Sequence, residues 1–274
     1  MRKQVDQQIE RHTNQALLGF WGAPFFKKAV LGLIFLCTAS VLLGACASRQ
    51  RVPSASALPL ALSESPPEGE DNRFWWEARF KIVWPSDHAP DSAVDLLLAH
   101  AVIEPLLKDH AKHLLRWRFH RRAAPDSTGH QFTFFFYTNT DTAAELFKKI
   151  KENDHLIQAL SAQIVEKVIL DNPDKPSRPQ IEDTSDPQWS PSLQKNWPSY
   201  IMGVSALWLG LIDDEMTQVS HLPGMEISQQ LETYRKAEIR ITKSWNREGQ
   251  HAFLHHLSAV FGYEPLLIRK NILF

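Results

Sequence analysis

The feature that most constrains the fold is an uncharged apolar run over residues 29–45, close to the start of the chain. It follows Lys27 and Lys28, and a basic segment before an apolar core is typical of a signal peptide. The alternative is an uncleaved membrane anchor, since about twenty apolar residues span a hydrocarbon core of roughly 30 Å. Positive residues favour the cytoplasmic side in both cases, so the rest of the chain is expected to be exported. The folded part therefore has to be built from later residues.

The apolar run ends in the sequence Leu43-Gly44-Ala45-Cys46. It resembles the lipobox of bacterial lipoprotein precursors, in which a large aliphatic residue and two small residues precede the cysteine that takes the lipid. The resemblance implies that residues 1–45 are a signal peptide and that Cys46 becomes the lipidated, palmitate-bearing start of the mature protein. Ala47 stands where inner-membrane retention usually shows Asp. The resemblance therefore implies sorting to the outer membrane, on the side facing the periplasm, in a cell that has one.

Cysteine content agrees with a lipid anchor. The chain has two cysteines, Cys37 and Cys46, and Cys37 lies in the segment that would be removed. The mature protein would then have no internal disulfide, so its stability has to come from a hydrophobic core. An exported chain with one free thiol would be unusual, and lipidation of Cys46 removes that difficulty.

Charge argues against a nucleic-acid partner. Five basic and two acidic residues precede Cys46, and the whole chain has 30 and 31, which leaves 25 basic and 29 acidic residues in the mature part. Proteins that bind nucleic acid usually carry a clear basic excess. The expected partners are the membrane, through the lipid, and another protein of the cell envelope.

Residues 46–72 are rich in proline and serine and end in acidic residues. Such a composition buries too little apolar surface to offset the entropy of ordering. We interpret this segment as the lipid-bearing end of the mature chain and a flexible tether that separates the folded part from the membrane.

The next hundred residues alternate between strand and helix patterns. Strands are predicted over residues 74–84, 114–122, 130–138 and 163–170; helices are predicted over 92–113, bent at Pro105, and from 140 onward with a break near Asn153. This order is that of the split βαβ unit. It predicts an α+β, ferredoxin-like domain over residues 73–171, with two helices on one face of a four-stranded antiparallel sheet. The predicted helical face carries Phe80, Trp117, Phe132 and Phe134.

Residues 172–274 are predicted to form a proline- and acid-rich crossing followed by helices packed on the sheet domain. Helical patterns cover residues 190–216, 227–245 and 247–261, and the tail over 265–274 could add a strand. The helical stretch over 201–212 is uncharged but too short to cross a membrane.

The side of the sheet opposite the core is expected to be basic, through Arg79, Arg116 and Arg118. Two interpretations stay open. Acidic residues of the crossing segment could fold back and form ion pairs with these arginines, with the C-terminal helices covering the rest of the face. Otherwise the face would bind an anionic ligand or partner. The acidic candidates are Glu182, Asp183 and Asp186.

Glu248, His251 and His255 are spaced to share one side of a predicted helix and could hold a metal ion. A second Glu-x-x-His, needed for a di-iron centre, is absent, as is the His-Glu-x-x-His of zinc proteases. A half-exposed polar helix face is the favoured interpretation, so no cofactor is expected.

Catalytic motifs are otherwise missing. The sequence has no nucleophile elbow and no glycine-rich phosphate loop among its 11 glycines. The favoured function is a non-enzymatic, lipid-anchored binding or assembly module of the cell envelope. The alternative is a membrane-tethered enzyme with a metal or acid–base site around Glu248, His251 and His255.

Overall fold

The computed structural model describes residues 72–85, 87–217 and 224–264. The predicted signal peptide, Cys46 and nearly all of the predicted tether lie outside these residues, as does the predicted strand over 265–274. None of the described helices is both long enough and apolar enough to cross a membrane.

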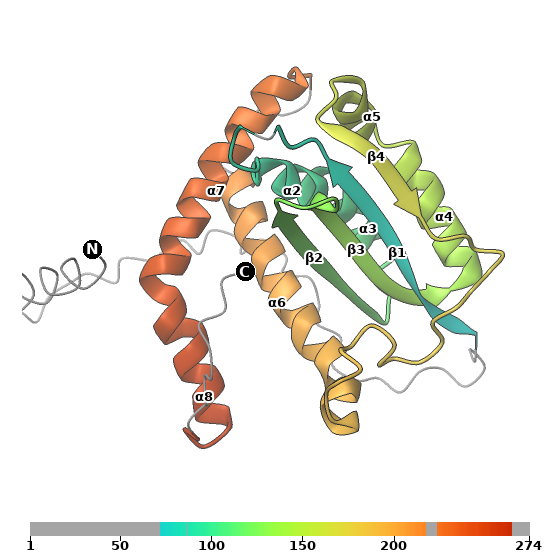
Figure 1. The fold of residues 1–274 in the computed structure, drawn as a ribbon, viewed down its shortest axis with the longest axis vertical. Coiled ribbons are helices and arrows are strands. Elements are labelled where there is room, and N and C mark those ends of the chain that lie inside the picture. The colour runs from blue at the N-terminus through green and yellow to red at the C-terminus, as the bar shows by residue number, and fades with distance from the viewer. Residues whose placement is uncertain (1–71, 86, 218–223, 265–274) are drawn as a thin grey trace, which may run out of the picture. The chain divides into compact units, whose positions relative to one another are not determined.

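The sheet confirms the predicted α+β class and the four antiparallel strands. Its strands are β1 (Arg73–Ile82), β2 (Arg116–Ala124), β3 (Gly129–Asn139) and β4 (Val165–Leu170), in the spatial order β2-β3-β1-β4 (Figure 1). In this register Ala78 of β1 lies opposite Phe134 of β3 on one side and Leu170 of β4 on the other. Phe119 of β2 also lies opposite Phe134, so a row of apolar side chains crosses the sheet.

The hairpin between β2 and β3 is closed by Asp126. Its carboxylate accepts hydrogen bonds from the backbone N–H groups of Thr128 (2.9 Å) and Gly129 (3.2 Å), and from Arg122. Gly129 has a φ of 69°, a left-handed conformation that is easiest for glycine. The predicted hairpin is therefore formed by the turn residues that the sequence places there.

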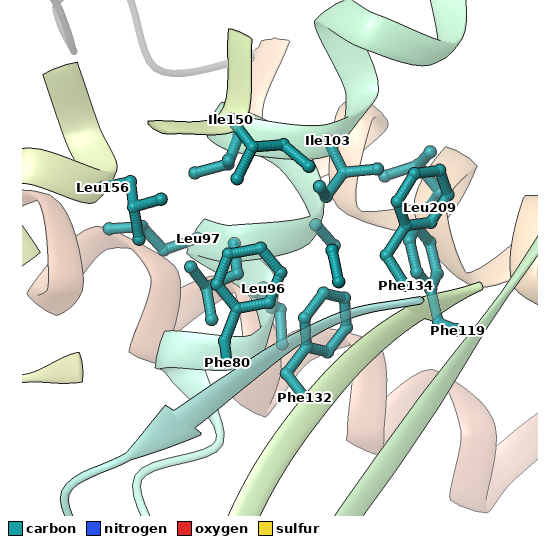
Figure 2. Packing of buried hydrophobic residues seen from close by; sticks show 14 of the residues in the cluster. Phe80, Leu96, Leu97, Ile103, Phe119, Phe132, Phe134, Ile150, Leu156 and Leu209 are labelled. Atoms are coloured by element: carbon teal, nitrogen blue, oxygen red, sulfur yellow. The ribbon is translucent and has the colours of Figure 1, made fainter. Parts of the chain in front are cut away.

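One face of the sheet carries the core. Phe80, Phe132 and Phe134 are fully buried, and Trp117 is 9% exposed, which confirms the predicted facing of these strands. The helices over this face are α2 (Ala93–Leu97), α3 (Glu104–Asp109), α4 (Thr140–Lys151), α5 (Asp154–Ser161) and the π-helix η1 (Leu98–Ile103). Figure 2 shows their leucine and isoleucine side chains meeting the phenylalanines of the sheet.

The predicted single helix over 92–113 is three consecutive helical pieces, with η1 immediately before α3. Pro105 explains the change, because it has no N–H to donate to the carbonyl four residues earlier. That carbonyl, of Ala101, instead accepts a hydrogen bond from the Asn153 side-chain amide at 3.1 Å. The Asn153 side-chain oxygen accepts the N–H of Leu156 and so caps α5. One residue therefore starts the helix after the predicted break and satisfies the carbonyl that Pro105 leaves free.

The C-terminal helices are α6 (Pro191–Thr217), α7 (Ile227–Gly249), the π-helix η2 (Gln250–His255) and α8 (His256–Val260). The prediction that the C-terminal helices cover the charged face of the sheet is wrong for α6 and α7, which pack elsewhere. The helix α6 lies along the edge strand β2, where the Ser205 hydroxyl accepts the backbone N–H of Phe119 at 3.0 Å. The Trp208 ring contacts Phe119 and Phe132, on the core face. The helix α7 packs against α2 and α6 (Figure 1).

Candidate functional site

The charged side of the sheet is crossed at one end by the segment over residues 172–190. Backbone carbonyls of this segment accept hydrogen bonds from the sheet: Arg178 from the Trp75 N–H (2.8 Å), Ile181 from the Trp75 indole (2.9 Å) and Pro179 from the Tyr137 hydroxyl (2.6 Å). These contacts hold the proline-rich crossing on the face where it was predicted.

Arg178 is the ionic centre of this crossing. Its guanidinium pairs with Glu77 at 3.4 Å and with Asp171, while Glu77 also pairs with Arg79. Burial raises the pKa of Asp171, although Arg178 opposes this effect. The predicted basic residue Arg79 is thus neutralised within its own strand, and the crossing segment contributes a cation as well as its acids.

The other predicted arginines, Arg116 and Arg118, form no ion pair with a carboxylate of the described residues. Arg118 donates to the Thr184 carbonyl at 3.3 Å and lies over the Phe135 ring at 4.2 Å, and burial lowers its pKa to about 10. Its Nε has no hydrogen-bond partner among the described residues, and neither has that of Arg116. Arg116 donates to the Leu115 carbonyl at 2.8 Å, and burial lowers its pKa too.

Two of the predicted acidic partners accept hydrogen bonds from their own turns. Asp183 accepts the backbone N–H of Gln180 and Asp186 that of Gln188, both at 2.8 Å. Short acidic side chains at turns commonly bond to nearby backbone in this way. Among the ion pairs within the described part of the chain, none joins Glu182, Asp183 or Asp186 to Arg79, Arg116 or Arg118, so the structure does not support the predicted pairing with these three arginines.

Glu248, His251 and His255, the predicted metal ligands, lie at the junction of α7 and η2. Glu248 pairs with the adjacent Arg247. The rings of His251 and His255 stack at 5.1 Å, and His255 also contacts Tyr263. Both histidines belong to the π-helix η2, whereas Glu248 is in the last turn of α7. Among the described residues these three do not form a cluster of ligand atoms, so the structure does not support this metal site.

A different cluster forms where η1 and α3 meet α6. Ligand atoms of His100, Glu104 and Asp213 all lie within 4.8 Å of one another. The His100 Nε2 is 3.5 Å from a Glu104 oxygen and 3.8 Å from an Asp213 oxygen. Lys108 balances part of this negative charge, with its Nζ 2.8 Å from Glu104 and 3.8 Å from Asp213.

Burial controls the electrostatics of this cluster. It lowers the pKa of His100, although Asp213 opposes the shift, and it raises the pKa of Glu104. The fully buried Tyr234, on α7, has its hydroxyl 2.8 Å from the His100 Nδ1, and burial raises the pKa of that hydroxyl. Burial therefore disfavours the charged form of the imidazole, whose Nδ1 lies against a phenol and whose Nε2 faces two carboxyl groups.

The sequence contains part of the signal for this cluster. His100 and Glu104 are four residues apart in a predicted helix and so share a face. Asp213 and Tyr234 lie more than a hundred residues later, and only the docking of α6 and α7 brings them close. Sequence spacing alone therefore pointed to Glu248, His251 and His255 and not to this cluster.

An exposed apolar surface is the second candidate. Tyr200, Val204 and Leu207 line one side of α6 and are each more than two-fifths exposed. Beyond Ile241, the last buried apolar residue of α7, the helices continue through η2 and α8 without a buried side chain. We call residues 242–264 the C-terminal arm.

The arm exposes several large apolar side chains: Trp245, Leu254, Val260, Phe261 and Tyr263. Large exposed apolar patches mark protein or membrane contact surfaces. No protein-family model, curated protein or solved structure matches this chain at significant similarity.

Proposed function

We propose that this chain is an exported lipoprotein, anchored at the cell envelope through Cys46, whose folded unit is a non-enzymatic binding or assembly module. The lipobox-like end of the apolar run supports the anchor, and the proline- and serine-rich residues 46–72 supply a tether. The first strand begins at Arg73, directly after that tether. The position of Ala47 favours the periplasmic face of an outer membrane, where the cell has one.

We also infer that the sheet and its helices form a ferredoxin-like unit. The strand order supports this inference: β3 lies between β1 and β2, and β1 lies between β3 and β4. Each strand–helix–strand connection thus skips one strand, as the split βαβ arrangement requires.

The observation that carries the binding role is the C-terminal arm. Val260 is 82% exposed and Phe261 is 69% exposed, at the end of α8, whereas α7, which precedes η2 and α8, is packed in the core up to Ile241. Burial of such a side chain contributes a free energy of about 1.5–3 kcal/mol, which these exposed side chains do not gain in the isolated protein. A protein partner in the envelope that covers the arm would recover it. The mild acidity of the mature chain gives no support to a nucleic-acid partner.

The anchor is tested by labelling cells with palmitate. Wild-type protein should take up the label, and Cys46→Ser should not. Cys46→Ala serves as a second unlabelled variant, because it also removes the sulfur. Equal labelling of wild type and Cys46→Ser would contradict the proposal.

The binding role is tested by placing a photo-crosslinking amino acid at Phe261 of the anchored protein in cells. A discrete cross-linked product is expected there and not at Lys112, an exposed position in the loop before β2. The same pattern, or no product, at both positions would show that the arm is not a contact surface.

The alternative of an enzyme centred on Glu248, His251 and His255 has less support. Acid–base or metal chemistry needs these groups to converge on one point. Glu248 is instead engaged by Arg247. We therefore do not propose an enzymatic function for this part of the chain.

A further inference from the structure

We propose that His100, Glu104 and Asp213 form a binding site for a divalent transition-metal ion of the zinc type. The site lies inside the folded unit, away from the C-terminal arm, and goes beyond the proposed docking role. Its ligands come from η1, α3 and α6, so a bound ion would connect the helical layer over the sheet to the helix along the sheet edge.

The distances between the side chains match metal ligation better than direct bonding. At 3.5 and 3.8 Å, the contacts from His100 to the two carboxyl groups are longer than hydrogen bonds, which run to about 3.2 Å. In a tetrahedral zinc site with ligand bonds of about 2.0–2.1 Å, neighbouring ligand atoms are separated by about 3.4 Å. Ligand atoms of all three groups lie within 4.8 Å of one another, so an ion between them would require the groups to move closer together and Lys108 to leave Glu104.

The surroundings of His100 fit a metal ligand. Such a histidine nearly always has its second ring nitrogen hydrogen-bonded, which fixes the ring orientation. Tyr234 does this for Nδ1 at 2.8 Å, and the ring of Tyr234 lies edge-on to the imidazole. His100 also belongs to a π-helical turn, a feature that frequently occurs at functional sites.

The ligand set selects the class of metal. Imidazole suits zinc, copper, iron and nickel, whereas calcium and magnesium prefer oxygen ligands alone. One histidine and two carboxylates leave a fourth position for water or another ligand. Glu104 is 4% exposed, whereas the side chains of Asp213 and Lys108 are 27% and 52% exposed, so the site is more accessible to solvent from their side.

Lys108 is the competing cation. Its ammonium group pairs with Glu104 and approaches Asp213, and so supplies the positive charge that a metal ion would bring. The Lys108 side chain is 52% exposed and can move into solvent when an ion arrives. Metal binding should therefore be strengthened when this charge is removed, whereas a purely structural ion-pair network would gain nothing.

The test uses the full-length protein in detergent, stripped with a chelator and titrated with Zn²⁺ by calorimetry, with bound metal counted by mass spectrometry. All variants carry His251→Gln and His255→Gln, so that the other histidine cluster cannot supply the signal. One Zn²⁺ per chain is expected. Tyr234→Phe should weaken binding by about 10- to 100-fold. Lys108→Met should tighten it about fivefold or more, as expected for a unit charge removed from about 4 Å.

His100→Gln and Glu104→Gln should abolish stoichiometric binding while circular dichroism shows folded protein. If either variant fails to fold, Asp213→Asn on the partly exposed side of the site replaces it. The proposal is overturned if neither the starting protein nor Lys108→Met binds Zn²⁺, or if binding survives all three ligand substitutions. Its failure would leave the palmitate and cross-linking results for the proposed function unaffected.

Discussion

At the scale of single residues, burial and local backbone decide which charges pair. Arg178 meets two carboxylates, while Arg118 meets a carbonyl and an aromatic ring. The sequence showed basic residues on the strands and acids in the crossing. It did not show that Asp183 and Asp186 would bond to their own turns, because that choice depends on the backbone path of the crossing.

Replacement of these two arginines by methionine should have opposite consequences. Arg118→Met should change the free energy of unfolding by less than about 1 kcal/mol or raise it, because a desolvated guanidinium without a carboxylate gains little from its site. Arg178→Met should lower it by about 1–3 kcal/mol, since charged hydrogen bonds to Glu77 and Asp171 are lost. Urea denaturation of both variants measures this. A larger loss for Arg118→Met would indicate the carboxylate pairing that the sequence suggested.

At the scale of elements, alternation of apolar residues was sufficient to predict strands β1 to β3 and their buried face. Pro105 predicted a bend, but the π-helical turn before it depends on Asn153, which arrives from the next helical region. The hydrophobic periodicity of α6 predicted a helix but did not indicate that it packs along the edge strand β2. An edge strand needs its outward N–H groups satisfied, and here a serine on a distant helix does so.

Ser205 should therefore matter more than its neighbours on α6. Ser205→Ala leaves the Phe119 N–H without its acceptor at a buried position, which should cost about 1–3 kcal/mol of unfolding free energy. Ser199→Ala, at an exposed position of the same helix, is the matched control and should be nearly neutral. Hydrogen exchange at the Phe119 amide should accelerate in Ser205→Ala alone. Equal stability of the two variants would mean that α6 does not protect this edge.

At the scale of the whole molecule, the apolar side chains of the C-terminal helices fall into two groups: those of α6 and α7 buried in the core, and those exposed on the C-terminal arm. The proposed envelope address and tether rest on short, local patterns of the sequence alone. The His100 cluster and the C-terminal arm depend on how α6 and α7 pack, which no local pattern specifies. The apolar residues of α7 look alike along the sequence, yet Ile241 is buried while Trp245, one turn later, is half exposed.

Because the core and the C-terminal arm use different apolar residues, substitutions in the arm should reduce binding without lowering the stability of the fold. The triple variant Leu254→Ser, Val260→Ser and Phe261→Ser should change the unfolding free energy by less than about 1.5 kcal/mol, because each exposed substitution typically contributes about 0.5. Leu209→Ala, in the core contact of α6, should cost about 2–5 kcal/mol. With the photo-crosslinker moved to Trp245, the triple variant should lose the cross-linked product while remaining folded. If the triple variant unfolds as readily as Leu209→Ala, the arm belongs to the hydrophobic core and its exposed residues are not a docking surface.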